Sequence, residues 1–247
     1  MLQQFGINST IIQAPMAGVT TPSFVAASCE AGALGFIAAG YLNKEELISF
    51  IQNVKTKTRQ PFGVNVFIQD EAVPDKQTLT EAKAALQPIY DELSITTEPS
   101  FTFENHFSEQ LEAILTENIR VVSFTFGLPP KEMIQRLKEN NVFLMATATT
   151  KDEALAVATA GFDAVILQGC EAGGHRGSFI QPTEFIPLEE LITQVQGTIS
   201  IPIIAAGGLM TREQISKALA LGADAVQIGT ALLVADECEI PPAYKQA

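Results

Sequence analysis

The chain has 247 residues, of which 47% are hydrophobic and 17% charged, and its formal net charge is −13. This composition excludes global disorder, because enough apolar surface is available to form a large core. The excess of carboxylates disfavours binding to nucleic acid or to an anionic membrane surface. The length fits one (β/α)8 barrel of about 250 residues, or two smaller domains.

The cysteines and the N-terminus indicate the compartment. Cys29, Cys170 and Cys238 form no CxxC pair and have no metal-ligand spacing, which is typical of a reducing cytosol. No apolar run reaches the roughly 18 residues needed to span a bilayer, and the first ten residues lack the regions of a signal peptide. We therefore expect a cytoplasmic protein with no metal site and no membrane segment.

Eight short apolar segments, rich in β-branched residues, alternate with helical patterns along the chain. Several are apolar at consecutive positions, as in the strands of a parallel sheet that is covered on both faces. The predicted strands span residues 11–16, 34–38, 62–67, 121–125, 143–146, 164–168, 203–206 and 225–228.

Helix boundaries are marked between these strands. Thr21-Pro22 is a cap residue followed by proline at the first helical position. Cap residues with a side chain that can reach back from three positions later are Asn43 with Glu46, Thr150 with Glu153, and Thr211 with Gln214. Helices are expected to end at Gly32, Gly161 and Gly222.

A weak internal repeat distinguishes between possible architectures. Residues 150–165 (TKDEALAVATAGFDAV) and 211–226 (TREQISKALALGADAV) share a cap, an apolar stripe, a closing glycine and the start of the next strand in register. Repeated helix–glycine–strand units predict an α/β fold of the (β/α)8 TIM barrel type. A doubly wound open sheet is the alternative.

Two regions depart from an ideal barrel. Residues 69–118 are polar and contain one helical pattern at 75–93, which predicts an elaborated region after strand three. Few residues follow Thr230, and they include Pro241-Pro242, so the expected barrel has a shortened C-terminus. We expect a single domain over residues 1–247 with an insertion at about 69–118.

Two glycine-containing loops predict a phosphate site. In such barrels the active site lies at the carboxyl ends of the strands, and phosphate commonly binds after strands seven and eight. Residues 205–209 (AAGGL) and 227–230 (QIGT) stand at these two positions. Glycines let backbone N–H groups approach phosphate oxygens closely, and the Thr230 hydroxyl can donate as well. The alternative is that these glycines only turn the chain.

The densest group of polar residues follows strand six, at residues 168–177 (QGCEAGGHRG). His175 in this loop is a candidate general base, because the imidazole pKa normally lies near neutrality. Arg176 could pair with an anion. An exposed loop with incidental charges is the alternative interpretation.

Other strand ends carry groups that would face the same rim. Asn65 interrupts the apolar third strand, and Ser123 and Thr125 lie in the fourth. After strand one, the backbone from Ala14 onward and the side chain of Met16 could face a flat apolar ligand such as a flavin ring.

These segments together resemble the nitronate monooxygenase family, formerly called 2-nitropropane dioxygenases. The matching segments are APMAGVTTP (14–22), GVNVF (63–67), SFTFG (123–127), LQGCEAGGHRG (167–177), IPIIAAGG (201–208) and GADAVQIGT (222–230). The resemblance implies a TIM barrel with non-covalent FMN and His175 as the catalytic base. The residues implied to contact FMN are Asn65, Gln168, Gly173, Gly208, Gln227, Ile228, Gly229 and Thr230, to which the strand-one end adds Ala14 and Met16.

The resemblance also implies a reaction. The family oxidises alkyl nitronates, such as propionate 3-nitronate, with molecular oxygen, giving a carbonyl compound and nitrite. With a neutral nitroalkane, His175 would first remove the α-proton. The implied partners are therefore a small nitronate or nitroalkane and O2, and the oligomeric state stays open.

Two alternatives accompany this interpretation. FMN-dependent enoyl-acyl carrier protein reductases share the EAGGH segment, but Gln168 and Phe67 favour the nitronate enzyme. The other alternative is a shortened, inactive barrel that binds FMN or nothing, because family members continue past strand eight into a helical segment over the active site that is largely absent here.

Overall fold

The computed structural model describes residues 1–69, 75–96 and 105–246, and the residues form two compact units. One unit comprises Met1–Ile68 with His106–Ala247, and the other comprises Gln69–Asn105. The strands are β1 (Ile11–Gln13), β2 (Gly35–Ala38), β3 (Phe62–Phe67), β4 (Val121–Thr125), β5 (Phe143–Ala148), β6 (Ala164–Gln168), β7 (Ile203–Ala206) and β8 (Ala225–Ile228).

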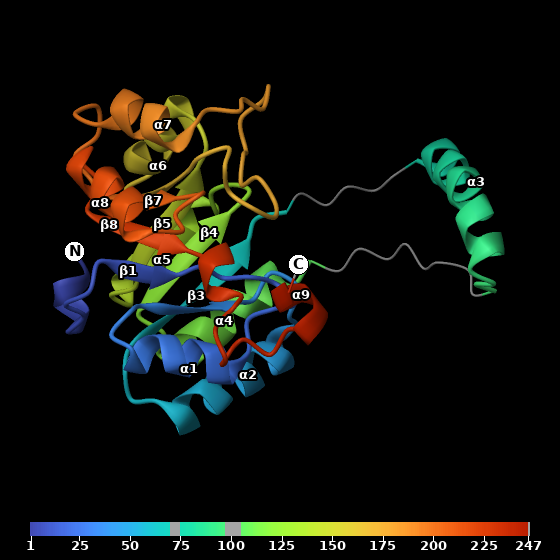
Figure 1. The fold of residues 1–247 in the computed structure, drawn as a ribbon, viewed down its shortest axis with the longest axis horizontal. Helices are drawn as coiled ribbons and strands as arrows, with labels where there is room; N and C mark the ends of the chain where they lie inside the picture. Colours follow the sequence, from blue (N-terminus) through green and yellow to red (C-terminus); the bar gives the residue numbers. More distant parts are fainter. Residues whose placement is uncertain (70–74, 97–104, 247) are drawn as a thin grey trace. The chain divides into compact units, whose positions relative to one another are not determined.

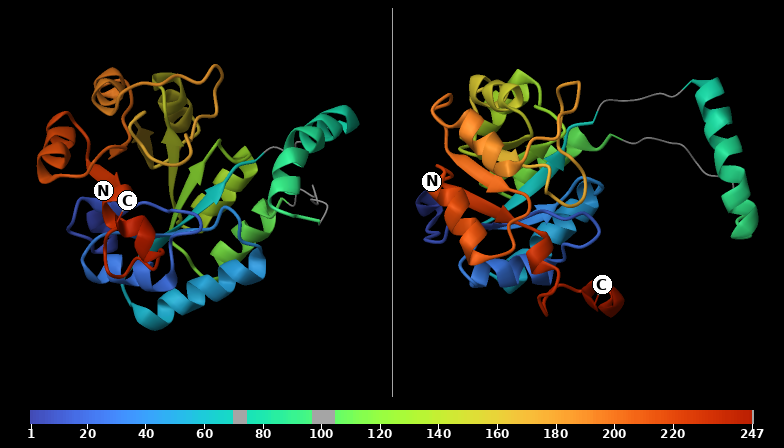
Figure 2. Two further views of the ribbon diagram at one scale, coloured as in Figure 1. Left: turned by 45° about the vertical axis from the view of Figure 1, so that its right-hand side comes forward. Right: turned by 45° about the horizontal axis from the view of Figure 1, so that its top comes forward.

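In the unit that contains the strands, helices alternate with the strands and lie around them (Figures 1 and 2). The α-helices are α1 (Pro22–Glu30), α2 (Lys44–Lys57), α3 (Lys76–Glu92), α4 (Phe107–Thr116), α5 (Lys131–Glu139), α6 (Lys151–Thr159), α7 (Leu188–Val195), α8 (Arg212–Ala220) and α9 (Pro242–Gln246). Two 3₁₀ helices are η1 (Leu2–Phe5) and η2 (Thr230–Leu232).

The sheet is parallel throughout and has the order β1-β8-β7-β6-β5-β4-β3-β2. It closes between β1 and β2 through a short bridge, in which Gln13 N donates to Leu34 O at 2.9 Å. The buried Gln13 side chain extends this junction, since its Oε1 accepts from Phe36 N at 2.9 Å. The predicted (β/α)8 barrel is therefore confirmed, and the open sheet is wrong.

The first strand is shorter than predicted. It ends at Gln13 and not at residue 16. Pro15 cannot donate to a strand ladder, and Met16 N instead donates to Thr20 Oγ1 at 2.9 Å. Residues 14–16 thus belong to the turn that leads from the barrel mouth into α1.

The predicted helix starts are confirmed with one exception. Asn43 with Glu46 and Thr211 with Gln214 form complete capping boxes. Thr150 caps α6 by accepting from Glu153 N, but the Glu153 carboxylate does not return to the Thr150 backbone. The capping box predicted there is wrong, because this side chain is bound elsewhere.

Apolar side chains form two layers. The inner layer fills the barrel and contains Ile12, Phe36, Val121, Met145, Ile166 and Ile204, with Leu2 and Ile7 of the N-terminal segment. The outer layer lies between strands and helices. Because strands β3, β4 and β6 have polar residues near their carboxyl ends, a polar floor is left for a site at that end of the barrel.

The second unit contains α3, at the position of the predicted helical pattern. Asp75 caps it by accepting from Gln77 N and Thr78 N, and none of its side chains is buried. In the part of the chain that the structure describes, no helix is both long and apolar enough to cross a bilayer.

Candidate active site

The loop that follows β6, residues 169–187, is here called the histidine loop. Its first half is fixed by Gln168, the last residue of β6. Gln168 Oε1 accepts from Gly177 N at 2.8 Å, and Gln168 Nε2 donates to His175 O at 3.1 Å. Both ends of the amide are thus engaged by the loop backbone, an arrangement that the sequence did not indicate.

The histidine loop folds over the ends of β4 and β5. A Cβ atom on Gly177 would lie 2.7 Å from Thr147 Cγ2 and 3.1 Å from Thr125 Cγ2. Only glycine allows the backbone to approach these two threonines so closely. The loop is therefore seated on the rim at Gly177, while several of its residues, such as His175, are exposed.

His175 lies exposed at the mouth, beside aromatic rings from other strands. Its ring is 6.1 Å from that of Phe126, which follows β4, and Phe126 is 4.9 Å from Phe67 at the end of β3. Tyr41 continues the row, with its ring 5.5 Å from Phe67. An imidazole that is open to solvent, with an apolar ring beside it, is accessible to a small organic substrate.

Asn65, in β3, is buried. Its Nδ2 lies 2.9 Å from Ser123 Oγ and 3.0 Å from Thr125 Oγ1. The three polar residues predicted on strands three and four are therefore brought together.

The two glycine loops meet the histidine loop. Gly207 and Gly208 have φ angles of +112° and +67°, and a Cβ atom on Gly208 would lie 2.8 Å from Glu171 Cβ. A Cβ atom on Gly173 would lie 3.2 Å from Thr230 Oγ1. The loops after β6, β7 and β8 therefore pack closely through glycines, which keeps backbone N–H groups accessible.

The end of β1 completes this side of the rim. A Cβ atom on Gly229 would lie 3.3 Å from Ala14 Cβ and 3.4 Å from Met16 Sδ. Ile228 differs from its neighbours, because its side chain packs in the outer layer and its carbonyl accepts from Ala14 N at 2.8 Å. Its contact with a ligand would thus involve the amide and not the side chain.

Two buried polar atoms have no partner among the described residues, Gln227 Oε1 and Arg176 Nε. An orphaned buried acceptor is unfavourable unless a ligand or water satisfies it. Gln227 is the penultimate residue of β8, two positions before Gly229. A ligand with N–H or O–H donors and a phosphate, such as FMN, fits this combination of an orphaned acceptor and glycine loops.

Arg176 is held beside the rim. Its Nη2 donates to Thr149 O at 3.3 Å, and its guanidinium lies 5.2 Å from the centre of the Phe185 ring. The guanidinium provides a positive charge next to His175 in a chain of net charge −13.

The cysteines take no visible part in this arrangement. Cys170 is exposed in the histidine loop, while Cys29 and Cys238 are buried. Burial raises the pKa of the Cys29 thiol to about 11, which makes it a poor nucleophile.

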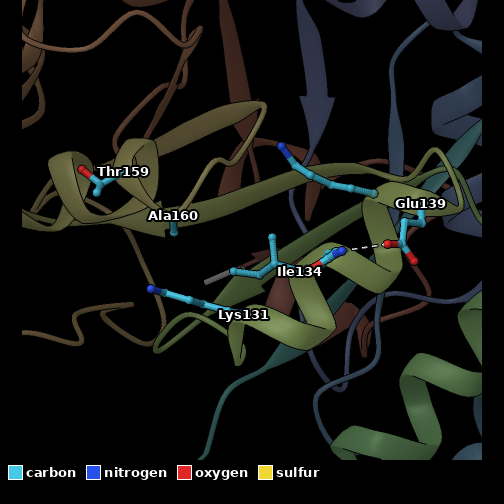
Figure 3. A pocket seen from close by; sticks show the side chains of 7 residues that line it. Lys131, Ile134, Glu139, Thr159 and Ala160 are labelled. Carbon is cyan, nitrogen blue, oxygen red and sulfur yellow. Dashed lines mark hydrogen bonds between the residues drawn. The ribbon is translucent and has the colours of Figure 1, made fainter.

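A hollow on the outside of the barrel is separate from these residues (Figure 3). It lies between α5 and the C-terminal end of α6 and is lined by Lys131, Ile134, Gln135, Lys138, Glu139, Thr159 and Ala160. None of the predicted site residues lines it.

Comparison with known proteins gives the family of the chain. The family model for nitronate monooxygenase matches residues 1–247. The chain belongs to the nitronate monooxygenase family. A probable nitronate monooxygenase from Staphylococcus aureus (strain MSSA476) is 41% identical over 242 residues, which are 96% of this chain and 68% of that protein.

Two solved structures are similar to this chain over nearly its whole length. Nitroalkane oxidase from Streptomyces ansochromogenes superposes with a TM-score of 0.91 at 40% identity, covering 99% of this chain and 71% of that one. FabK from Thermotoga maritima gives a TM-score of 0.77 at 29% identity, covering 99% and 65%. The likeness to the nitroalkane oxidase is thus the greater in both fold and sequence.

Proposed function

We propose that the chain binds FMN and oxidises alkyl nitronates with molecular oxygen, giving a carbonyl compound and nitrite. The observation that carries this proposal is the accessible His175, fixed by Gln168 at the carboxyl rim of a barrel whose neighbouring loops fit a phosphate. Membership of the nitronate monooxygenase family gives the class of reaction.

The residues that would hold FMN lie at or just after the carboxyl ends of five strands, β1, β3, β6, β7 and β8. They are Ala14, Met16, Asn65, Gln168, Gly173, Gly208, Gln227, Ile228, Gly229 and Thr230. When bound, the flavin supplies the redox chemistry by taking electrons from the substrate, and oxygen completes the oxidation. The protein contributes position and electrostatic field.

His175 and Arg176 would act on the substrate. A nitronate is a small anion, and the Arg176 guanidinium offsets the negative background near it. A neutral nitroalkane must first lose its α-proton, which the exposed His175 imidazole can accept. A substrate that already is a nitronate bypasses this proton transfer.

Nitrite release tests the proposal. The purified chain, supplied with FMN, is mixed with propionate 3-nitronate under air without NAD(P)H, with free FMN as the control. We expect protein-dependent nitrite. Reduction of an enoyl thioester that requires NAD(P)H would support the reductase alternative, and FMN binding with neither activity would support an inactive barrel.

A further inference from the structure

Glu153 is a fully buried carboxylate at the third position of α6, and it joins two loops at the barrel mouth. Its Oε2 accepts from Thr149 N at 2.6 Å and from Thr149 Oγ1 at 2.8 Å. Its Oε1 accepts from Phe179 N at 2.5 Å, Ile180 N at 2.8 Å and Ser178 Oγ at 3.1 Å. One oxygen thus holds the turn after β5, and the other holds the histidine loop.

The surroundings of Glu153 suit an ionised carboxylate. The described residues provide it with no ion-pair partner, so its charge is stabilised by these five donors and by the N-terminus of α6. Burying such a group without its hydrogen bonds would be strongly unfavourable. The hydrogen bonds from the histidine loop therefore help to offset the cost of burying the carboxylate.

The internal repeat shows which part of this arrangement exceeds helix capping. Gln214 occupies the equivalent position in α8, and its Oε1 accepts from Met210 N at 2.8 Å and Thr211 N at 2.9 Å. A single amide oxygen is thus sufficient to cap that helix. In α6 the second oxygen of Glu153 is available for another role, and it binds the histidine loop.

Glu153 and Gln168 fix the histidine loop on both sides of Arg176. Gln168 binds the backbone at His175 and Gly177. Glu153 accepts from the Ser178 hydroxyl and from the backbone N–H groups of residues 179 and 180. Arg176 itself donates to the carbonyl of Thr149, the same residue whose N–H and hydroxyl bind Glu153. The loop is therefore held by two side chains, Gln168 at the end of β6 and Glu153 in α6.

We propose that Glu153 is a positioning residue, which holds the histidine loop so that His175 and Arg176 keep their places at the mouth. It contacts loop backbone and hydroxyl groups and takes no proton from the substrate. The effect on the loop stands on geometry alone, whereas the effect on turnover rests on the proposed function.

Hydrogen exchange of the full chain tests the anchor directly. Glu153→Gln keeps one oxygen for the helix cap, as Gln214 does in α8, but turns an NH₂ group toward the donors of the loop. We expect the amides of Phe179 and Ile180 to exchange about tenfold faster or more, the scale of losing a charge-assisted hydrogen bond. Glu46→Gln, which removes a carboxylate from the same position of α2, should leave these amides unchanged.

Unchanged exchange at Phe179 and Ile180 in a folded Glu153→Gln protein would overturn the proposal. If that variant fails to fold, Glu153→Asp replaces it, because the shorter carboxylate can still cap α6 while falling short of the loop. The same loss of protection is expected there, and its absence would count equally against the anchor.

Turnover measures the consequence for His175. With a neutral nitroalkane, we expect Glu153→Gln to lower kcat by about tenfold or more while FMN content is retained. In the His175→Ala background the same substitution should have little further effect on kcat. Additive losses would overturn the positioning role. If the unaltered chain forms no nitrite, the proposed function fails, while the exchange measurement still decides whether Glu153 anchors the loop.

Discussion

At the scale of single residues, the site depends on how the histidine loop is held. Gln168 lies at the strand end, and its amide nitrogen and oxygen each form a hydrogen bond with the loop backbone. His175 is thereby presented by its main chain while its ring stays open to solvent. A ring held in this way can reach a substrate without being committed to a partner in the protein.

Substitution of this ring separates the two substrate classes. His175→Ala should retain FMN and lose about 10²–10⁴-fold in turnover of a neutral nitroalkane, the usual contribution of a general base. Oxidation of propionate 3-nitronate should suffer far less, since its proton is already gone. Steady-state nitrite assays on both substrates measure the difference.

The chain provides a matched control for that experiment. His106, the other histidine, precedes α4 and is not one of the predicted site residues, and His106→Ala should leave both activities intact. Equal losses on both substrates in His175→Ala would contradict the role of a proton acceptor.

The sequence predicted which residue types gather at the rim, but not how they are bonded. Strand ends place Asn65, Ser123 and Thr125 together, and this follows from strand order alone. Gln168 forms two hydrogen bonds with the loop, and Glu153 binds two loops at once. Both arrangements depend on the path of residues 169–187. That path is set by packing against β4 and β5, which no local pattern encodes.

At the scale of elements, the packing of α4 against the barrel includes one buried polar side chain, Gln110, beside the buried apolar ones. Gln110 Nε2 donates to Ala39 O at 2.7 Å and to Leu42 O at 2.6 Å, which fixes α4 against the loop between β2 and α2. That loop contains Tyr41, the outermost ring of the aromatic row. The packing of α4 therefore bears on the shape of the mouth.

Removing the hydrogen bonds of Gln110 should lower the stability of the fold measurably. Gln110→Leu removes both hydrogen bonds and takes the donor from the Leu42 carbonyl, whereas Ala39 O still accepts from Leu42 N at 2.9 Å. This loss is expected to lower the free energy of unfolding by about 1–3 kcal/mol. Denaturant unfolding measures it. Gln135→Leu, an exposed glutamine on α5, should change stability by less than about 0.5 kcal/mol. If Gln110→Leu lowered the free energy of unfolding no more than Gln135→Leu, the hydrogen bonds of Gln110 would be shown not to stabilise the fold.

Element boundaries were predictable where caps and glycines mark them. Thr21, Asn43 and Thr211 begin helices as expected, because their side chains accept from the first free N–H groups. The end of β1 was not predictable from its apolar run, since the turn at Pro15 and the bond from Met16 to Thr20 end the strand early. The burial of Gln110 likewise left no sign in an otherwise amphipathic pattern.

At the scale of the whole molecule, the repeated sequence units made the barrel fold predictable. Helix–glycine–strand units recur with one spacing, and eight buried parallel strands have few ways to close other than a barrel. The closure itself, through Gln13 and the short contact of β1 with β2, is a tertiary feature. The place of the site then follows from the fold, because all the loops that lead from a strand to a helix begin at the same rim of the barrel.

The most direct test of the account is an absorption measurement on the FMN-loaded chain. Under anaerobic conditions, propionate 3-nitronate is added and the visible flavin bands are followed, after which air is admitted. The account predicts protein-bound flavin bands that bleach with nitronate and return with oxygen, accompanied by nitrite. A chain that takes up no FMN, or whose flavin bands are unchanged by nitronate, would contradict it.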